Sequence, residues 1–159
     1  MTPTMIQLST TPIETILPHR GAMLLLDSVS AFDDETLTAH ATVRSDAWYA
    51  DAAGGMPAWI GVELMAQAIA AHVALLAMRD GGKARPGVLL GSRSFQAHQP
   101  AFARDARLSI EVKELLRSEE GHGAYECSIV HDGVCCAQAV VKVFQPVDFK
   151  SFIEGSFES

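Results

Sequence analysis

The chain has few cysteines and a deficit of positive charge. Cys127, Cys135 and Cys136 are odd in number and lack the spacing of metal ligands, so they indicate small core residues in a reducing compartment. Lysine and arginine number 12 against 19 aspartate and glutamate residues, and the resulting net charge of −7 disfavours nucleic acid and anionic lipid as partners. The sequence also has no phosphate-cradling glycine loop, no low-complexity tract and no internal repeat.

The N-terminal segment MTPTMIQLST has no basic head followed by an apolar run. No secretion signal is therefore predicted, and the cytoplasm is the expected location. A length of 159 residues fits one domain with a genuine core. Within it, residues 58–78 are long and apolar enough to suggest a transmembrane span, but Glu63, Gln67 and His72 interrupt them, which favours a buried helix.

Positive charge is nevertheless concentrated in one region. Residues 79–107 contain two acidic residues and six basic ones: Arg79, Lys83, Arg85, Arg93, Arg104 and Arg107. This distribution indicates either a solvated surface with some clustering or a docking patch for an acidic partner.

The apolar helix predicted from Pro57 to Met78 carries a polar pair, Glu63 and Gln67. At positions i and i+4 the two side chains share one face of a helix. Apolar surroundings disfavour the charged form of a carboxyl group, and a protonated carboxyl suits a proton donor. The pair therefore suggests acid chemistry, with Gln67 either orienting Glu63 or a substrate oxygen, or serving as a buried amide satisfied by a neighbouring carbonyl.

Alternating apolar residues predict strands on both sides of this helix. A short helical turn at 12–17 is followed by a hairpin of 23–32 and 36–43, and the strands after the helix are 87–97, 106–116, 122–131 and 134–144. Asp132-Gly133 gives the last two strands a tight connection. The expected fold is α+β, an antiparallel sheet of five to six strands wrapped around one long central helix.

Three motifs resemble those of a known family. Leu17-Pro18-His19-Arg20, the MLLLD of residues 23–27 and the ELMAQA of residues 63–68 resemble the 3-hydroxyacyl-(acyl carrier protein) dehydratases of hotdog fold. The PAWIGVELMAQAIAAH helix and the LLGSR strand are most similar to the branch associated with aryl polyene biosynthesis. The resemblance implies a single hotdog domain over 12–146, with an N-terminal extension (1–11) and a C-terminal tail (147–159).

The resemblance also implies a mechanism and a set of site residues. In such dehydratases a histidine removes the proton alpha to the thioester, and an acidic helix residue, here Glu63, protonates the departing hydroxyl with Gln67 beside it. The backbone N–H groups of Ala58 and Trp59, at the helix start, are candidates for polarising the thioester carbonyl. No cofactor or metal is implied, and the scattered histidines show no metal-ligand spacing.

The family's histidine is missing from its loop. Residues 48–57 read WYADAAGGMP, and the expected position falls on Tyr49, whose phenol is a poor base at neutral pH. His19 is the next candidate for the base or for a substrate contact, although a histidine packed at a helix stop is more often structural. His72 and His98 are weaker candidates, and His72 is better explained as a satisfied core residue.

Because hotdog dehydratases resemble one another in sharing sites across a dimer, a heterodimer with a histidine-bearing paralogue would complete one site with Glu63. Acyl carrier protein is the implied substrate carrier, and a homodimer remains an alternative. Two other functions stay open: a non-catalytic subunit that stabilises a partner or binds acyl chains, and a thioesterase on the same architecture.

Overall fold

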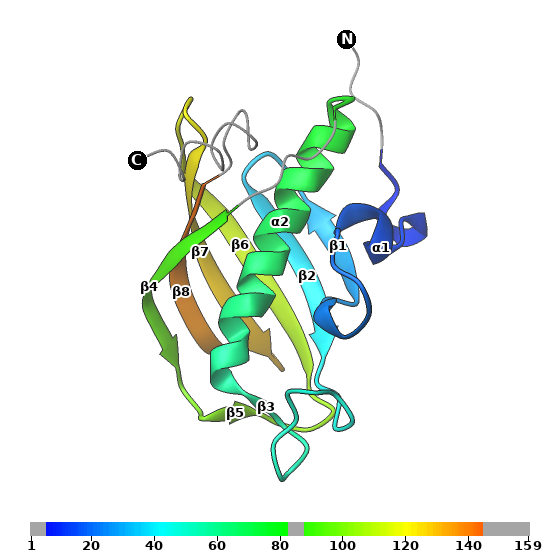
Figure 1. The fold of residues 1–159 in the computed structure, drawn as a ribbon, viewed down its shortest axis with the longest axis vertical. Coiled ribbons are helices and arrows are strands. Elements are labelled where there is room, and N and C mark those ends of the chain that lie inside the picture. Colours follow the sequence, from blue (N-terminus) through cyan, green and yellow to red (C-terminus); the bar gives the residue numbers. More distant parts are fainter. Residues whose placement is uncertain (1–5, 83–87, 145–159) are drawn as a thin grey trace, which may run out of the picture.

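The computed structural model describes residues 6–82 and 88–144. A six-stranded antiparallel sheet, in the order β1-β2-β6-β7-β8-β4, wraps around one long helix, α2 (Gly61–Arg79) (Figure 1). Its strands are β1 (Ser28–Phe32), β2 (Thr36–Thr42), β4 (Val88–Ala97), β6 (Arg107–Arg117), β7 (His122–His131) and β8 (Val134–Phe144). The α+β fold expected from the sequence, with six strands and a central helix, is confirmed.

Shorter elements lie at one end of this sheet and along one side of it (Figure 1). The strands β3 (Met56–Pro57) and β5 (Ala101–Phe102) pair at the lower end, where the 3-10 helix η3 (Ala58–Ile60) leads into α2. Before β1 come η1 (Leu8–Thr10), α1 (Ile13–Ile16) and η2 (Gly21–Met23). The pair β3–β5 was not predicted, and the strand predicted over 23–32 is wrong in its first half because β1 begins at Ser28.

The core lies between α2 and the concave face of the sheet. On β6, Leu108, Ile110 and Val112 are buried while the intervening side chains are at least partly exposed, as the period of two predicts. On α2, Leu64 and Leu75 are fully buried against this layer. The helix is long and apolar enough to cross a membrane by length and composition, but 67% of its apolar window is buried inside the fold.

One edge of the sheet is formed by β4, which pairs only with β8 in the described part of the chain. Such an edge presents unpaired backbone donors and acceptors. Close to it, α2 has a row of partly exposed apolar residues at helical spacing: Val62, Ala66, Ala70, Val73 and Ala77. The helix is therefore not enclosed on every side by its own sheet.

Candidate active site

Gln67 is a fully buried side chain of α2 whose amide has a partner at every position. Its Oε1 accepts hydrogen bonds from the N–H groups of Leu25 (3.0 Å) and Leu26 (3.3 Å), and its Nε2 donates to the Met23 carbonyl at 2.7 Å. The second Nε2 hydrogen is directed to Glu63 Oε1, 3.0 Å away. Gln67 thus fastens residues 23–26 to the helix and orients the carboxyl group, and its amide has no donor left for a substrate oxygen.

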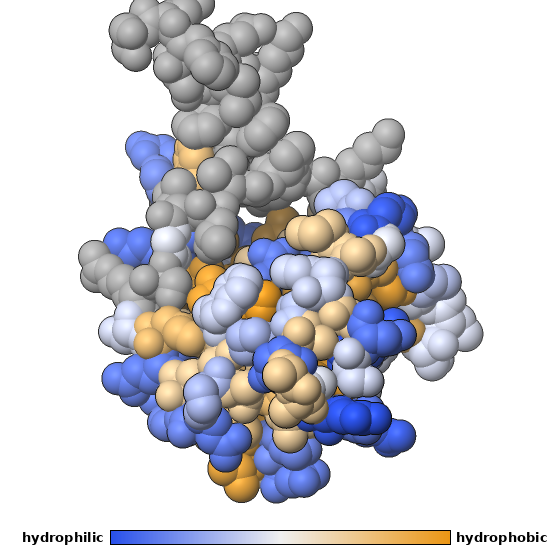
Figure 2. Space-filling view, turned by 60° about the horizontal axis from the view of Figure 1, so that its bottom comes forward, coloured by the Kyte–Doolittle hydropathy of each residue, from blue (hydrophilic) through white to orange (hydrophobic). Residues whose placement is uncertain are grey.

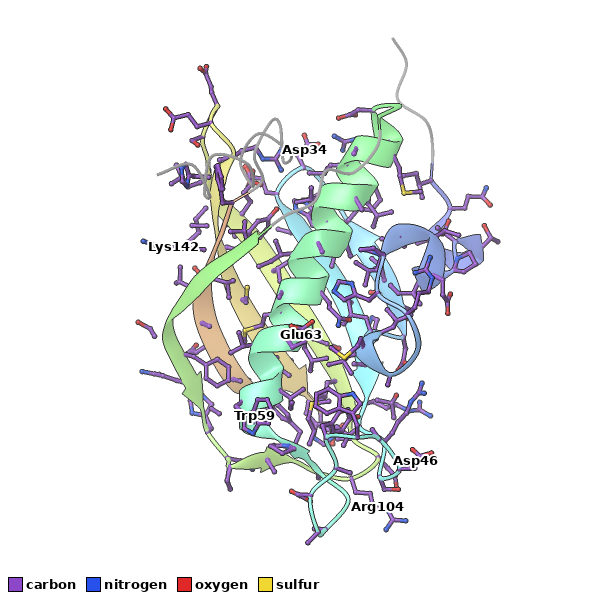
Figure 3. All side chains as sticks on the ribbon, in the orientation of Figure 1. Asp34, Asp46, Trp59, Glu63, Arg104 and Lys142 are labelled. Carbon is purple, nitrogen blue, oxygen red and sulfur yellow. The ribbon has the colours of Figure 1, made fainter. Side chains whose placement is uncertain are left out.

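Glu63 lies in the first turn of α2, one helical turn after Trp59, and the two side chains share one side of the helix (Figure 3). Its side chain is 37% exposed, and its Oε1 lies 3.9 Å from His19 Nε2. The apolar enclosure expected around this carboxyl group is therefore absent within residues 6–82 and 88–144. The carboxyl meets two polar side chains and solvent, and a second molecule or a substrate would desolvate it.

His19 is held in place by the residue that follows it. The Arg20 guanidinium donates from Nη1 to the carbonyls of Leu17 (2.6 Å) and His19 (2.7 Å), and from Nη2 to the carbonyl of Glu14 (2.7 Å). These bonds occupy carbonyl groups at the end of α1 that the four-residue helix leaves without a helical donor. The turn that ends α1 is thereby fixed with the imidazole next to Glu63.

The helix start differs in part from the expectation. The Ala58 N–H donates to the Pro100 carbonyl at 2.9 Å, a bond that joins η3 to the residue just before β5. This bond removes Ala58 as a candidate for polarising a thioester carbonyl, while the Trp59 N–H stays a prediction. The Trp59 side chain is 66% exposed and lies at the lower end of the molecule (Figure 3). The view of that end in Figure 2 shows apolar surface near the middle of the face.

The loop between β2 and β3 holds Tyr49 where the family's histidine is expected. Tyr49 is buried, and its hydroxyl oxygen accepts the Arg44 N–H at 3.0 Å. Its neighbour Trp48 is exposed, packs edge-on against the Tyr49 ring at 5.7 Å and donates its indole N–H to the Ala22 carbonyl at 2.8 Å. The loop therefore presents neither a histidine nor the Tyr49 phenol at the surface, and Tyr49 is part of the core.

The other histidine candidates lie elsewhere. His72 is fully buried, with Nδ1 2.8 Å from the Tyr125 hydroxyl and Nε2 2.9 Å from the Asp33 carbonyl, so the prediction of a satisfied core residue is confirmed. Burial lowers the pKa of His72, although the hydrogen bond to Asp33 opposes this. His98 is exposed at the end of β4, and its N–H donates to the Cys136 carbonyl. Neither imidazole contacts Glu63.

The basic region does not form one patch over the part that the structure describes. Arg79, at the end of α2, pairs with Asp34 (2.7 Å) and Asp80 (3.2 Å). Arg104 lies at the opposite end of the molecule from Asp34 (Figure 3). Residues 83–87 lie outside the described residues. Within residues 6–82 and 88–144, no group of three histidine, cysteine, aspartate or glutamate side chains is arranged to hold a metal ion.

Comparison with known proteins identifies relatives of this chain. The model of the ApeP-like family, described as ApeP dehydratase, matches residues 11–154. A chain of the dehydratase heterocomplex ApeI:P from Xenorhabdus doucetiae is 27% identical, with a TM-score of 0.86 over 93% of this chain and 99% of that one. The comparison with curated proteins finds no significant match.

More distant structures share the fold alone. A hypothetical thioesterase with coenzyme A from Streptococcus pneumoniae is 17% identical, with a TM-score of 0.60 over 74% of this chain and 84% of that one. A mutant of the thioesterase PA1618 from Pseudomonas aeruginosa is 18% identical, with a TM-score of 0.56 over 76% of this chain and 81% of that one. At these identities the likeness carries no information about the reaction.

Proposed function

Because this chain belongs to the ApeP-like dehydratase family, we propose that it is one subunit of a 3-hydroxyacyl-(acyl carrier protein) dehydratase that acts in aryl polyene synthesis. Glu63 supplies the acid, and a hotdog partner subunit supplies the base from a loop histidine. One observation carries this proposal: the chain has an oriented acid but no base to act with it. Gln67 holds Glu63 in place, whereas Tyr49 is buried and its hydroxyl is hydrogen-bonded to the Arg44 N–H.

The reaction eliminates water across two adjacent carbons. The partner's histidine takes the proton from the carbon alpha to the thioester, and the electron pair of that bond forms the new double bond. Glu63 gives its proton to the hydroxyl group on the next carbon, so the carbon–oxygen bond breaks and water leaves. An acid and a base on separate side chains are what this step requires. The product is the trans-2-enoyl thioester, still attached to the acyl carrier protein.

A partner would also change the surroundings of Glu63. The carboxyl group is 37% exposed in this chain, and covering it with a second subunit would desolvate it and favour the protonated form that a proton donor needs. The exposed row of small apolar residues on α2 and the edge of β4 are the surfaces that we propose to meet that subunit. The Xenorhabdus protein is a heterocomplex of two kinds of chain, which supports a partner that differs from this one.

The test compares the purified chain alone, its partner alone and the two mixed, with a 3-hydroxyacyl thioester of acyl carrier protein as substrate. We expect dehydration only from the mixture. Replacing Glu63 with Gln should reduce its rate by roughly 100-fold or more, since general acid catalysis contributes about 10²–10⁴-fold. Glu126→Gln is the matched control, because Glu126 is an exposed carboxylate of β7.

Other outcomes would point to the alternatives. Full activity of the chain alone would reject the shared site. A Glu63→Gln complex with nearly unchanged activity would indicate a non-catalytic subunit that stabilises its partner. Release of the free acid from the thioester, without an enoyl product, would indicate a thioesterase.

A further inference from the structure

His19 and Glu63 lie at a separation that a single oxygen atom can bridge from one side. Their nearest atoms, His19 Nε2 and Glu63 Oε1, are 3.9 Å apart, which is too far for a direct hydrogen bond. An atom placed about 2.8 Å from both would make a hydrogen bond with each. The two side chains are 28% and 37% exposed, so the position between them is reached from solvent.

The surroundings of the imidazole decide which of its nitrogens carries the hydrogen. His19 Nδ1 is buried and has no hydrogen-bond partner among residues 6–82 and 88–144. Orphaned buried N–H groups are rarer in proteins than acceptors with an unused lone pair. The hydrogen of the neutral ring therefore belongs on Nε2, the nitrogen that faces Glu63.

This tautomer gives His19 a definite chemical capacity. Nε2 offers a donor to the site and no lone pair, while the lone pair of Nδ1 lies in the interior. His19 can hold an oxygen atom at the site but cannot accept a proton there. The backbone that carries this ring is held by Arg20, which binds three carbonyl groups around the same turn.

We propose that His19 binds the hydroxyl oxygen of the 3-hydroxyacyl group through Nε2–H, so that this oxygen lies between His19 and Glu63 while it leaves. The inference rests on the proposed function and assigns to His19 the recognition of the leaving group. During the reaction Glu63 transfers its proton to the oxygen, the carbon–oxygen bond breaks, and the resulting water keeps its hydrogen bond to His19. His19 neither gains nor loses a proton, and the base that removes the alpha proton remains the partner's histidine.

Two variants of His19 test whether this residue acts as a hydrogen-bond donor or as a base. In His19→Gln the side-chain amide carries a donor to about the position of Nε2, whereas His19→Leu has similar bulk and no donor. In the complex with the partner, we expect His19→Leu to lower kcat/KM by roughly 10- to 100-fold and His19→Gln to lose only a few-fold. The dependence of the rate on pH should be the same in His19→Gln as in the wild type. Equal losses in the two variants would overturn the proposal.

The binding of substrate analogues distinguishes recognition of the hydroxyl group by His19 from a purely structural role of His19. The probes are a 3-hydroxyacyl pantetheine thioester and the same thioester without its hydroxyl group. We expect His19→Leu to raise the Kd of the hydroxylated probe by about 2- to 10-fold, the range of one hydrogen bond, and to leave the Kd of the other unchanged. Equal weakening of both probes, or of neither, would overturn the proposal.

Failure of the proposed function can be recognised separately. If Glu63→Gln keeps full activity, Glu63 is not the acid and the proposed mechanism is wrong. If Glu63→Gln is inactive while His19→Leu matches the wild type in rate and in both Kd values, only the role of His19 is wrong. The thermal unfolding midpoint of each variant complex, measured alongside, identifies a loss caused by misfolding.

Discussion

Within the core, His72 Nδ1 and the Tyr125 hydroxyl are joined by a hydrogen bond of 2.8 Å that links α2 to β7. Because Nε2 must donate to the Asp33 carbonyl, Nδ1 of neutral His72 has no hydrogen and is an acceptor. The Tyr125 hydroxyl has one hydrogen and two acceptors within reach, His72 Nδ1 and Glu114 Oε2 at 3.1 Å, and Arg117 pairs with the same carboxylate at 2.7 Å. Burial raises the pKa of Tyr125, with Glu114 adding to the shift, so this phenol stays protonated.

The buried imidazole predicts a pH dependence of stability. Burial lowers the pKa of His72 below its ordinary value of 6.5, so on acidification the unfolded chain takes up a proton before the folded one does. The free energy of unfolding should therefore fall as pH drops below about 6.5, until the folded form is protonated as well. Urea unfolding at several pH values from 5 to 8 measures this slope. The charged groups that act on the ring are Glu114, Arg117 and Asp33.

His72→Phe should lower stability at pH 7.5 by about 1–3 kcal/mol, because the Tyr125 hydroxyl and the Asp33 carbonyl each lose a partner. It should also flatten the slope below pH 6.5. His131→Gln, at the partly exposed end of β7, is the control and should keep the slope. An unchanged slope in His72→Phe would show that another group is responsible.

Gln67→Leu should destabilise the fold by about 2–4 kcal/mol, because three backbone groups of residues 23–26 lose their partner in or near the core. It should also lower the activity of the complex, since Glu63 loses the donor that orients it. Gln138→Leu, an exposed change on β8, should alter stability by less than about 0.5 kcal/mol. Chemical denaturation measures the free energy of unfolding of both variants. Equal losses of stability would contradict the role assigned to Gln67.

The cysteines should differ sharply in their reaction with iodoacetamide. Burial raises the pKa of the Cys127 thiol to about 12, and its side chain is inaccessible, so it should remain unmodified in the folded protein. Cys135 is exposed and should react first, followed by Cys136. Mass spectrometry of peptides, after labelling under native and under denaturing conditions, measures the fraction of each cysteine that is modified. Early modification of Cys127 would mean that β7 opens locally.

Gly55→Ala should destabilise the protein by about 1–3 kcal/mol, the usual range for overpacking. A Cβ atom at Gly55 would lie 2.7 Å from the Phe102 carbonyl oxygen, which is backbone and cannot turn aside. Gly82→Ala is the matched control, since its Cβ would meet only the Ala77 carbonyl at 3.6 Å. Thermal unfolding of both compares them, and a Gly55→Ala midpoint equal to that of the control would contradict the close approach.

The strands were predictable wherever one face of a strand meets α2 and the other meets solvent. The strands β2, β6, β7 and β8 therefore begin and end within one residue of the predicted limits. The two-residue turn at Asp132-Gly133 was equally readable, and both residues have the positive φ values, 51° and 78°, that such a turn requires. In each case the residues that determine the structure lie within the segment itself.

Residues 23–27 could not be predicted in this way. Their apolar run indicates a strand, yet the N–H groups of Leu25 and Leu26 bind the side chain of Gln67, more than 40 residues away in the chain. Ala58 is a similar case because its N–H is taken by Pro100. The spacing of Glu63 and Gln67 correctly predicted their contact, but not the other three partners of the amide.

The burial of Tyr49 limits what a substitution at this position can achieve. A histidine at position 49 would lie in the core and not at the surface, because the Tyr49 side chain is buried and its hydroxyl receives the Arg44 N–H. The substitution would therefore lose a core contact without supplying a base at the surface. A catalytic histidine in this loop would require the backbone of the loop itself to be rearranged.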